Sequence, residues 1–304
     1  MTQPLAIDLD HVGVATRDLD AGERAFRRLG FNLTPRSFHR GSCAPGAPIE
    51  EWGSGNHCAM LQRGYLEVIG LTDPAKFSSV KSMLDLYQGT HIVAFKPQSV
   101  RHVRDILAAR RLPVDDVREL ERMTAYGPDA REQGRVAFRN MYWTRSHFTE
   151  ARLQYTEHLT RDVMWQPHLL EHPNGALGMS CVFLCAPNAS AVAHKLAPML
   201  GIDPLPVCDG EYDLRLSSSR MKILTPAAWN DWAPGTALPP LPAPAGLAVE
   251  VRSLAETRSY FARQAIGFRE GREHGIWIDP KDAGNTVVYF FDHKSPAISV
   301  DRTA

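Results

Sequence analysis

The sequence predicts an α+β fold built from four repeats of one unit, a strand followed by a helix and then three strands. Two observations carry this prediction. The same order of short apolar runs and helical spacings recurs four times along the chain. In three of the four copies the predicted helix is followed by LGF, LGI or IGF, so the units share a helix end as well as an element order.

The first unit begins with an apolar strand at Leu9. Its helix has Asp18 as a candidate N-cap, apolar residues at helical spacing, and Gly30 where a C-cap is expected. Residues 36–55 are rich in Gly, Pro and Ser and predict a long loop. The later strands of this unit are expected at residues 57–62 and 65–71.

The other three units repeat this order, although the second strand is faint in most copies. The second unit is predicted as a strand at 91–95, a helix at 100–111, and strands at 134–143 and 151–159. The third has a strand at 179–186, a helix at 189–200, and strands at 212–218 and 220–226. The fourth has a strand at 246–251, a helix opened by the capping-box residues Ser253 and Glu256, and strands at 275–280 and 286–292.

Two segments without clear periodicity separate these units. Residues 161–178 are predicted to connect two domains, and residues 233–246 form a Pro-rich spacer expected to be extended and to carry no chemistry. A single unit leaves a sheet with an exposed edge, whereas two units side by side make a curved, nearly closed sheet around a cavity. We therefore expect two paired domains, at residues 1–160 and 179–304.

Composition excludes several classes of protein. Lys plus Arg equals Asp plus Glu, 34 each, and the arginines are scattered, which argues against a nucleic-acid-binding protein. No signal peptide and no run of roughly 18 apolar residues is found, so we expect no membrane span. The five cysteines are odd in number and lack CxxC spacing, which is typical of reduced thiols and a cytoplasmic location. They are Cys43, Cys58, Cys181, Cys185 and Cys208.

Three motifs give the chain a resemblance to a known superfamily. The stretches DHVGVATRDLD, GYLEVIG and THIVAF resemble the vicinal oxygen chelate superfamily, and within it the glyoxalase-like group. This resemblance implies paired βαβββ modules around a small-molecule site. It identifies the superfamily better than the reaction, because isomerases, lyases, dioxygenases and antibiotic-binding proteins share these motifs.

The resemblance also implies candidate metal ligands. Superposing the four units on their strand–helix boundary aligns His11, His91, Cys181 and Gly246. In the metal-binding families of this superfamily the first strand of a module gives His or Gln and the last gives Glu, which selects His11, Glu67 and His91. Imidazole and carboxylate suit Fe, Zn, Mn or Ni, and a divalent cation would remove the desolvation cost of a carboxylate on a buried strand.

The fourth ligand is open between two residues. Gln154 is the direct equivalent of Glu67 and is a candidate weak ligand. Glu157, three residues on, is a candidate general base, although an ideal strand would aim it to the other side unless a bulge intervenes. The alternative use of His11 is as a hydrogen-bonded core histidine, and that of Glu67 is as the partner of a buried arginine.

Other residues are candidates for a substrate pocket. His57, Phe138 and Trp143 are placed there, with a surface histidine and ordinary core aromatics as the alternatives. The C-terminal pair offers Cys181 and Gly246 where ligands would be needed, so it is expected to be a structural or dimerising domain, or a lid.

Two hypotheses of function follow. The first is a cytoplasmic, metal-dependent enzyme of the glyoxalase-like type that acts on a small oxygen-chelating substrate by lyase, isomerase or dioxygenase chemistry. The second is a metal-free protein of the same fold that binds a drug or metabolite in its apolar cavity. A small molecule is the expected partner in both, and a homodimer is one open arrangement.

Overall fold

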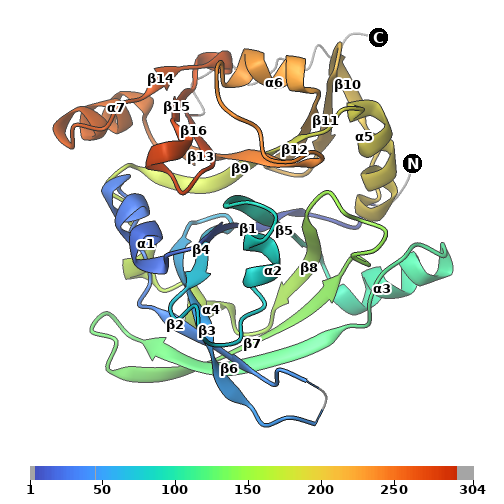
Figure 1. Cartoon of the computed structure of the whole chain (residues 1–304), viewed down its shortest axis with the longest axis vertical. Helices are drawn as coiled ribbons and strands as arrows, with labels where there is room; N and C mark the ends of the chain where they lie inside the picture. Colours follow the sequence, from blue (N-terminus) through green and yellow to red (C-terminus); the bar gives the residue numbers. More distant parts are fainter. Residues whose placement is uncertain (1–3, 45, 293–304) are drawn as a thin grey trace.

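Two eight-stranded sheets make up the fold. The computed structural model describes residues 4–44 and 46–292 of the chain, so the end of the predicted second domain, residues 293–304, lies outside the described residues. The strand orders are β2-β3-β4-β1-β5-β8-β7-β6 and β10-β11-β12-β9-β13-β16-β15-β14, so the two sheets share one topology. The predicted α+β fold of four βαβββ modules paired into two domains is confirmed (Figure 1).

The first sheet holds β1 (Asp8–Thr16), β2 (Ser37–Gly41), β3 (Glu50–Met60), β4 (Tyr65–Leu71), β5 (Gly89–Lys96), β6 (Arg118–Tyr126), β7 (Glu132–Tyr142) and β8 (Arg152–His158). The second holds β9 (Ala176–Cys185), β10 (Leu205–Cys208), β11 (Glu211–Arg215), β12 (Arg220–Leu224), β13 (Ala243–Val251), β14 (Arg269–Glu270), β15 (Ile276–Ile278) and β16 (Val287–Asp292). The α-helices are α1 (Leu19–Arg28), α2 (Lys81–Leu84), α3 (Val100–Ala109), α4 (Arg161–Met164), α5 (Ala189–Leu200), α6 (Pro226–Trp232) and α7 (Leu254–Arg263). Short 3₁₀ turns are η1 (Pro167–Leu169), η2 (Arg272–His274) and η3 (Pro280–Asp282).

The predicted helix signals act as expected. The Asp18 carboxylate accepts a hydrogen bond from the backbone N–H of Ala21 and caps α1, and the Ser253 hydroxyl caps α7 in the same way. Gly30 has a φ of +84° and directly follows the C-cap Leu29, which is where a helix end favours a residue without a Cβ.

The second strand of each module is the element that sequence patterns missed. The predicted loop at 36–55 contains β2 and the beginning of β3, and the predicted connector at 161–178 contains α4, η1 and the first residues of β9. In β6 most side chains are exposed or half-buried and many are charged, so no apolar alternation marks it as a strand. Pairing with neighbouring strands therefore decides these segments, not their own pattern.

The two domains pack back to back through their central strands. β1 lies against β9, and β5 lies against β13 (Figure 1). One continuous apolar core joins the two sheets and includes Val12 and Phe95 of the first domain and Val182 and Leu247 of the second. We call the face of each sheet that contributes to this shared core the outer face. The opposite, inner face of the first sheet carries Tyr65, Glu67 and their neighbours.

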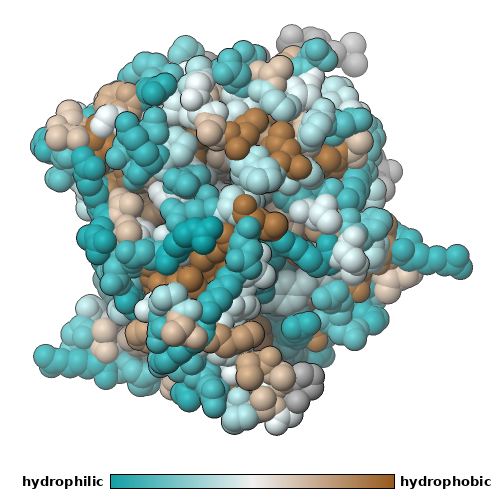
Figure 2. Space-filling model, in the orientation of Figure 1, coloured by the Kyte–Doolittle hydropathy of each residue, from teal (hydrophilic) through white to brown (hydrophobic). Residues whose placement is uncertain are grey.

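The face of the molecule drawn in Figure 2 is largely hydrophilic. Figure 2 shows apolar side chains reaching the surface around the boundary between the two domains. Among the described residues no helix has the length and apolar character that crossing a membrane would require.

Candidate functional site

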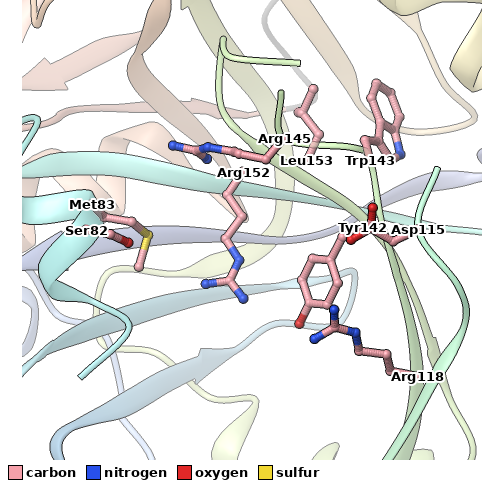
Figure 3. Close-up of a pocket in the computed structure, with 9 residues that line it drawn as sticks. All are labelled: Ser82, Met83, Asp115, Arg118, Tyr142, Trp143, Arg145, Arg152 and Leu153. Atoms are coloured by element: carbon pink, nitrogen blue, oxygen red, sulfur yellow. The ribbon is translucent and has the colours of Figure 1, made fainter. Parts of the chain in front are cut away.

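The inner face of the first sheet opens at one end into a cavity of about 520 Å³. At this end α2 covers the inner face, because Met83 and Leu84 pack against Ala15 and Ile92. Figure 3 shows the side chains around the cavity, which come from α2, the segment leading into β6, the end of β7 and the beginning of β8. They are Ser82, Met83, Asp115, Arg118, Tyr142, Trp143, Arg145, Arg152 and Leu153.

Three arginines, Arg118, Arg145 and Arg152, give this cavity its charge. Within the described part of the chain none of them forms an ion pair with a carboxylate. The guanidinium carbons of Arg118 and Arg152 lie 5.4 and 5.0 Å from the centre of the Tyr142 ring, a separation at which an aromatic face attracts a cation (Figure 3). Tyr142 therefore holds two positive charges at one wall.

The arginines also act on one another. Burial lowers the pKa of Arg145, and repulsion from the positive charge of Arg152 lowers it further. The carboxylate in the wall, Asp115, accepts a hydrogen bond from the hydroxyl of Thr144 at 3.3 Å. A bound anion would relieve the repulsion and offer both guanidiniums the bidentate partner that arginine prefers.

Trp143 borders the cavity, but its indole ring points away from the arginines. Trp143, which the sequence suggests as a substrate contact, lines the cavity and is 3% exposed. Its indole Nε1–H has no hydrogen-bond partner among the described residues. The Trp143 ring stacks on Phe95, with ring centres 5.5 Å apart, in the apolar core between the domains, so this donor lies on the outer side of the sheet and not in the cavity.

His11 belongs to a separate cluster on the inner face. Its Nδ1 donates to the Asp10 carboxylate at 2.7 Å, and the same oxygen accepts from Nε2 of His158 at 3.1 Å. The His11 ring stacks on Tyr65, with ring centres 4.5 Å apart. Burial opposes ionisation of Asp10, but the charge of His158 and the hydrogen bonds of both histidines outweigh it and hold the pKa of Asp10 well below its usual range.

Glu67 and Gln154 also lie on the inner face, each with a local partner. Glu67 accepts a hydrogen bond from the side-chain amide of Asn56 at 2.5 Å. The amide of Gln154 donates to the hydroxyl of Thr156 at 3.1 Å. The hydrogen-bond partner of Glu67 is thus an amide and not the buried arginine that the alternative reading of the sequence proposes.

His91 faces the other way. In the pairing of β1 with β5, Gly13 lies opposite Ile92 and Val14 lies opposite Thr90, so His91 is the extra residue of a β-bulge. Its Nε2 donates to the carbonyl of Tyr87 at 2.9 Å on the outer side of the sheet. This register explains why superposing the repeats by sequence matched His91 with His11 although the two side chains lie on opposite faces, because a one-residue shift turns a side chain to the opposite face.

The residue of β5 that matches His11 is Ile92. Tyr65 pairs with His11 two residues before Glu67, and Arg152 pairs with Ile92 two residues before Gln154. An isoleucine therefore stands where a second inward imidazole was expected.

Two further candidates lie on the outer face. The Glu157 carboxylate accepts from the backbone N–H of Val100 at 2.9 Å and so holds the N-terminus of α3. His57 contacts Glu23 of α1 at 3.1 Å. Neither side chain faces the cavity. Phe138 lies on the inner face with its ring centre 6.2 Å from that of His158, at the opposite end of β8 from the arginines.

The described residues do not fit a divalent metal. They contain no group of three or more His, Cys, Asp and Glu side chains that could hold one. His91 is on the opposite face from His11 and Glu67, and Gln154 is engaged by Thr156. The metal-binding roles of His11, Glu67, His91 and Gln154, and the catalytic role of Glu157, stay predictions that this geometry does not favour.

The inner face of the second domain is filled. Lys222 occupies the register position of Glu67, is fully buried, and pairs with Glu211 and with Asp213 at 2.8 Å. Trp232 packs beside it, with the ammonium 4.9 Å from the ring centre. The Lys222 ammonium therefore lies where a metal site would need a carboxylate.

Sequence reasoning missed Arg118, Arg145, Arg152 and Tyr142. One signal was available in β8, where polar residues alternate at the positions that face inward. These positions are Arg152, Gln154, Thr156 and His158. Arg118 and Arg145 carry no such signal, since they lie at an exposed strand start and in a loop.

A family model matches this chain. The family is described as a glyoxalase-like domain, and the match spans residues 9–200, from β1 to the end of α5. No curated protein matches the chain in sequence.

Solved structures share the fold over nearly the whole chain. A hypothetical protein from Staphylococcus aureus has a TM-score of 0.61 at 12% identity, covering 93% of this chain and 98% of that one. The Mn(II)-bound glyoxalase from Novosphingobium aromaticivorans has a TM-score of 0.55 at 14% identity, covering 95% and 83%. A 4-hydroxymandelate synthase mutant from Streptomyces coelicolor has 0.56 at 10%, covering 95% and 93%. At these identities the likeness is one of fold.

Proposed function

This chain belongs to the glyoxalase-like domain family, and we propose that its first domain binds a small organic anion in the cavity lined by Arg118, Arg145 and Arg152. The single observation that carries the proposal is that these three arginines face one cavity without a carboxylate partner among the described residues. Structural arginines usually find partners, whereas arginines that recognise carboxylate or phosphate are kept free for the ligand.

The wall supports binding of an anion in other ways. Tyr142 fixes Arg118 and Arg152 through its ring, which reduces the freedom they lose when a ligand arrives. Met83 of α2 supplies an apolar side chain to the wall. A carboxylate or phosphate group attached to a small apolar body matches this combination.

Metal-dependent chemistry is the weaker candidate. A solved structure of this fold is titled a Mn(II)-bound glyoxalase, and His11 and Glu67 of this chain share the inner face. The other two predicted donors do not join them, so we derive no step through a metal. The proposal therefore follows the second hypothesis from the sequence, a metal-free protein that binds a small molecule.

The experiment is a titration of the purified protein with acetate and with inorganic phosphate, followed by NMR chemical shifts. Arg152→Gln should weaken binding by about 10-fold or more, because it removes a charge-assisted hydrogen bond worth roughly 1.5–3 kcal/mol. Arg131→Gln is the matched control, because Arg131 is highly exposed in the β6–β7 connection, outside the cavity. Equal affinities of wild type and Arg152→Gln for both anions would contradict the proposal.

A metal analysis separates the two candidates. We expect the protein, as purified, to bind acetate equally before and after treatment with EDTA, and to lack stoichiometric Fe, Zn, Mn or Ni. Stoichiometric metal that disappears in both His11→Ala and Glu67→Gln would favour the metalloenzyme instead.

A further inference from the structure

A second cavity lies between the two domains. Its volume is about 240 Å³, and Arg145 is part of the walls of both cavities. The first domain contributes the segment after α2 and the segment before β8, and the second domain contributes the Pro-rich spacer before β13. The lining residues besides Arg145 are Leu86, Tyr87, His91, Thr149, Glu150, Ala151, Pro240, Leu241 and Pro242.

We propose that this interdomain cavity is a subsite for the ligand's body, so that the ligand is an anion with an apolar chain that ends in a hydroxyl group. The inference rests on the proposed function, since the anionic end is taken to lie among Arg118, Arg145 and Arg152. Because Arg145 borders both cavities, an anion held by its guanidinium can carry a chain that lies in the interdomain cavity.

The apolar wall favours a hydrocarbon chain. Leu86 is 54% exposed although it is a large hydrophobic side chain, and it lies in this wall together with Leu241. The prolines on either side of Leu241 present carbon surfaces without a backbone N–H. An alkyl chain placed against these side chains would remove apolar surface from water on both partners.

The polar end of the cavity favours a hydroxyl group. Glu150 is 4% exposed, and one of its oxygens accepts from the Lys195 ammonium at 2.6 Å. The other oxygen, Oε2, is buried without a hydrogen-bond partner among the described residues. Since Lys195 already balances the charge of this carboxylate, a neutral donor such as a hydroxyl fits better than an ammonium group.

The His91 side chain is an uncharged part of the wall of the interdomain cavity. Its ring stacks on Tyr87, with ring centres 3.9 Å apart, and its Nε2 is held by the Tyr87 carbonyl. Burial lowers the pKa of His91 to about 4, against a smaller upward effect of that hydrogen bond, so the imidazole is uncharged at neutral pH. The positive charge that lines the two cavities is therefore that of Arg118, Arg145 and Arg152.

The test compares acetate, hexanoate and 6-hydroxyhexanoate by NMR titration of the full chain. We expect hexanoate to bind roughly 10–100-fold more tightly than acetate, because four more methylene groups leave water, and 6-hydroxyhexanoate to bind about 5-fold more tightly again. Leu86→Ser should lower the affinity for hexanoate about 5-fold and leave that for acetate unchanged. Leu205→Ser is the matched control, because Leu205 is also an exposed leucine, 41% exposed, and lies on β10 outside both cavities; it should change neither affinity.

The outcomes separate this inference from the proposed function. Failure of all three anions to bind would overturn the proposed function itself. Binding of acetate and hexanoate with equal affinity, or a preference for hexanoate that Leu86→Ser leaves intact, would overturn the subsite alone. Glu150→Leu, whose side chain neither accepts nor donates a hydrogen bond, should remove most of the gain from the hydroxyl group, and a gain retained in full would overturn the role given to Glu150.

Discussion

At the scale of single residues, Asp10 is a buried carboxylate of the first domain. It is 2% exposed and accepts hydrogen bonds from both His11 and His158. A buried carboxylate is tolerated only when donors compensate its lost hydration, and here two imidazoles from opposite ends of the first domain's sequence do so. The histidine that stands among apolar residues of β1 thus serves this contact.

Replacing Asp10 tests this contact through its pH dependence. Asp10→Asn should lower the free energy of unfolding at pH 7 by roughly 1.5–3 kcal/mol, the range for hydrogen bonds to a charged group. Since the folded-state pKa of Asp10 lies below its unfolded value, the carboxylate stabilises the fold above about pH 4, and this stabilisation is lost as the pH falls further toward the folded-state pKa. Urea titrations at several pH values should show the gap to wild type narrowing below pH 4.

Asp116→Asn is the control for this series, because the side chain of Asp116 is 89% exposed. A gap between wild type and Asp10→Asn that stays constant down to pH 3 would show that the carboxylate charge is not the stabilising feature.

At the scale of elements, a β-bulge in β5 and the regular alternation of β8 decide which face of the sheet the candidate side chains on these two strands occupy. The bulge at His91 turns it outward and leaves Ile92 facing inward. On β8, strict alternation sends Gln154 inward and Glu157 outward, where Glu157 meets the first N–H of α3. Glu157 therefore links a strand to the helix that covers it.

Glu157→Ala tests this structural assignment against the catalytic role predicted from the sequence. We expect it to lower the free energy of unfolding by about 1 kcal/mol, as for the loss of a helix N-terminal hydrogen bond, while the affinity for acetate stays unchanged. Glu157→Gln, which keeps an acceptor oxygen, should restore most of the stability. Unchanged stability with weakened acetate binding in both variants would point back to a role in the site.

At the scale of the whole molecule, the two domains behave as one packed body because they share a core. Tyr155 of β8 is fully buried, and its hydroxyl donates to the carbonyl of Met199 at the end of α5, at 2.5 Å. Arg63 pairs with Glu250 across the same interface. The interdomain cavity exists only in this arrangement, since the second domain supplies one of its walls.

Cooperative unfolding is the expected consequence. Tyr155→Phe should lower the free energy of unfolding by roughly 1–2 kcal/mol, because the buried Met199 carbonyl loses its hydroxyl donor. Tryptophan fluorescence and far-UV circular dichroism should shift together in urea, as one transition. Tyr126→Phe, on β6 far from the second domain, should change the midpoint little; separate transitions for the two signals would contradict a shared core.

The sequence by itself determined the repeat, the α+β class and the pairing of modules into two sheets, because strand and helix periodicities and helix caps are local signals.

Only the tertiary structure decided which side chains share a space. A bulge of one residue moved His91 to the far face, and Arg118, Arg145 and Arg152 meet although they come from three separate segments. The Pro-rich spacer, which its composition predicts to be inert, became the wall of a cavity through packing against the other domain. Strand register and domain packing are set by contacts between residues distant in sequence, and no local pattern encodes them.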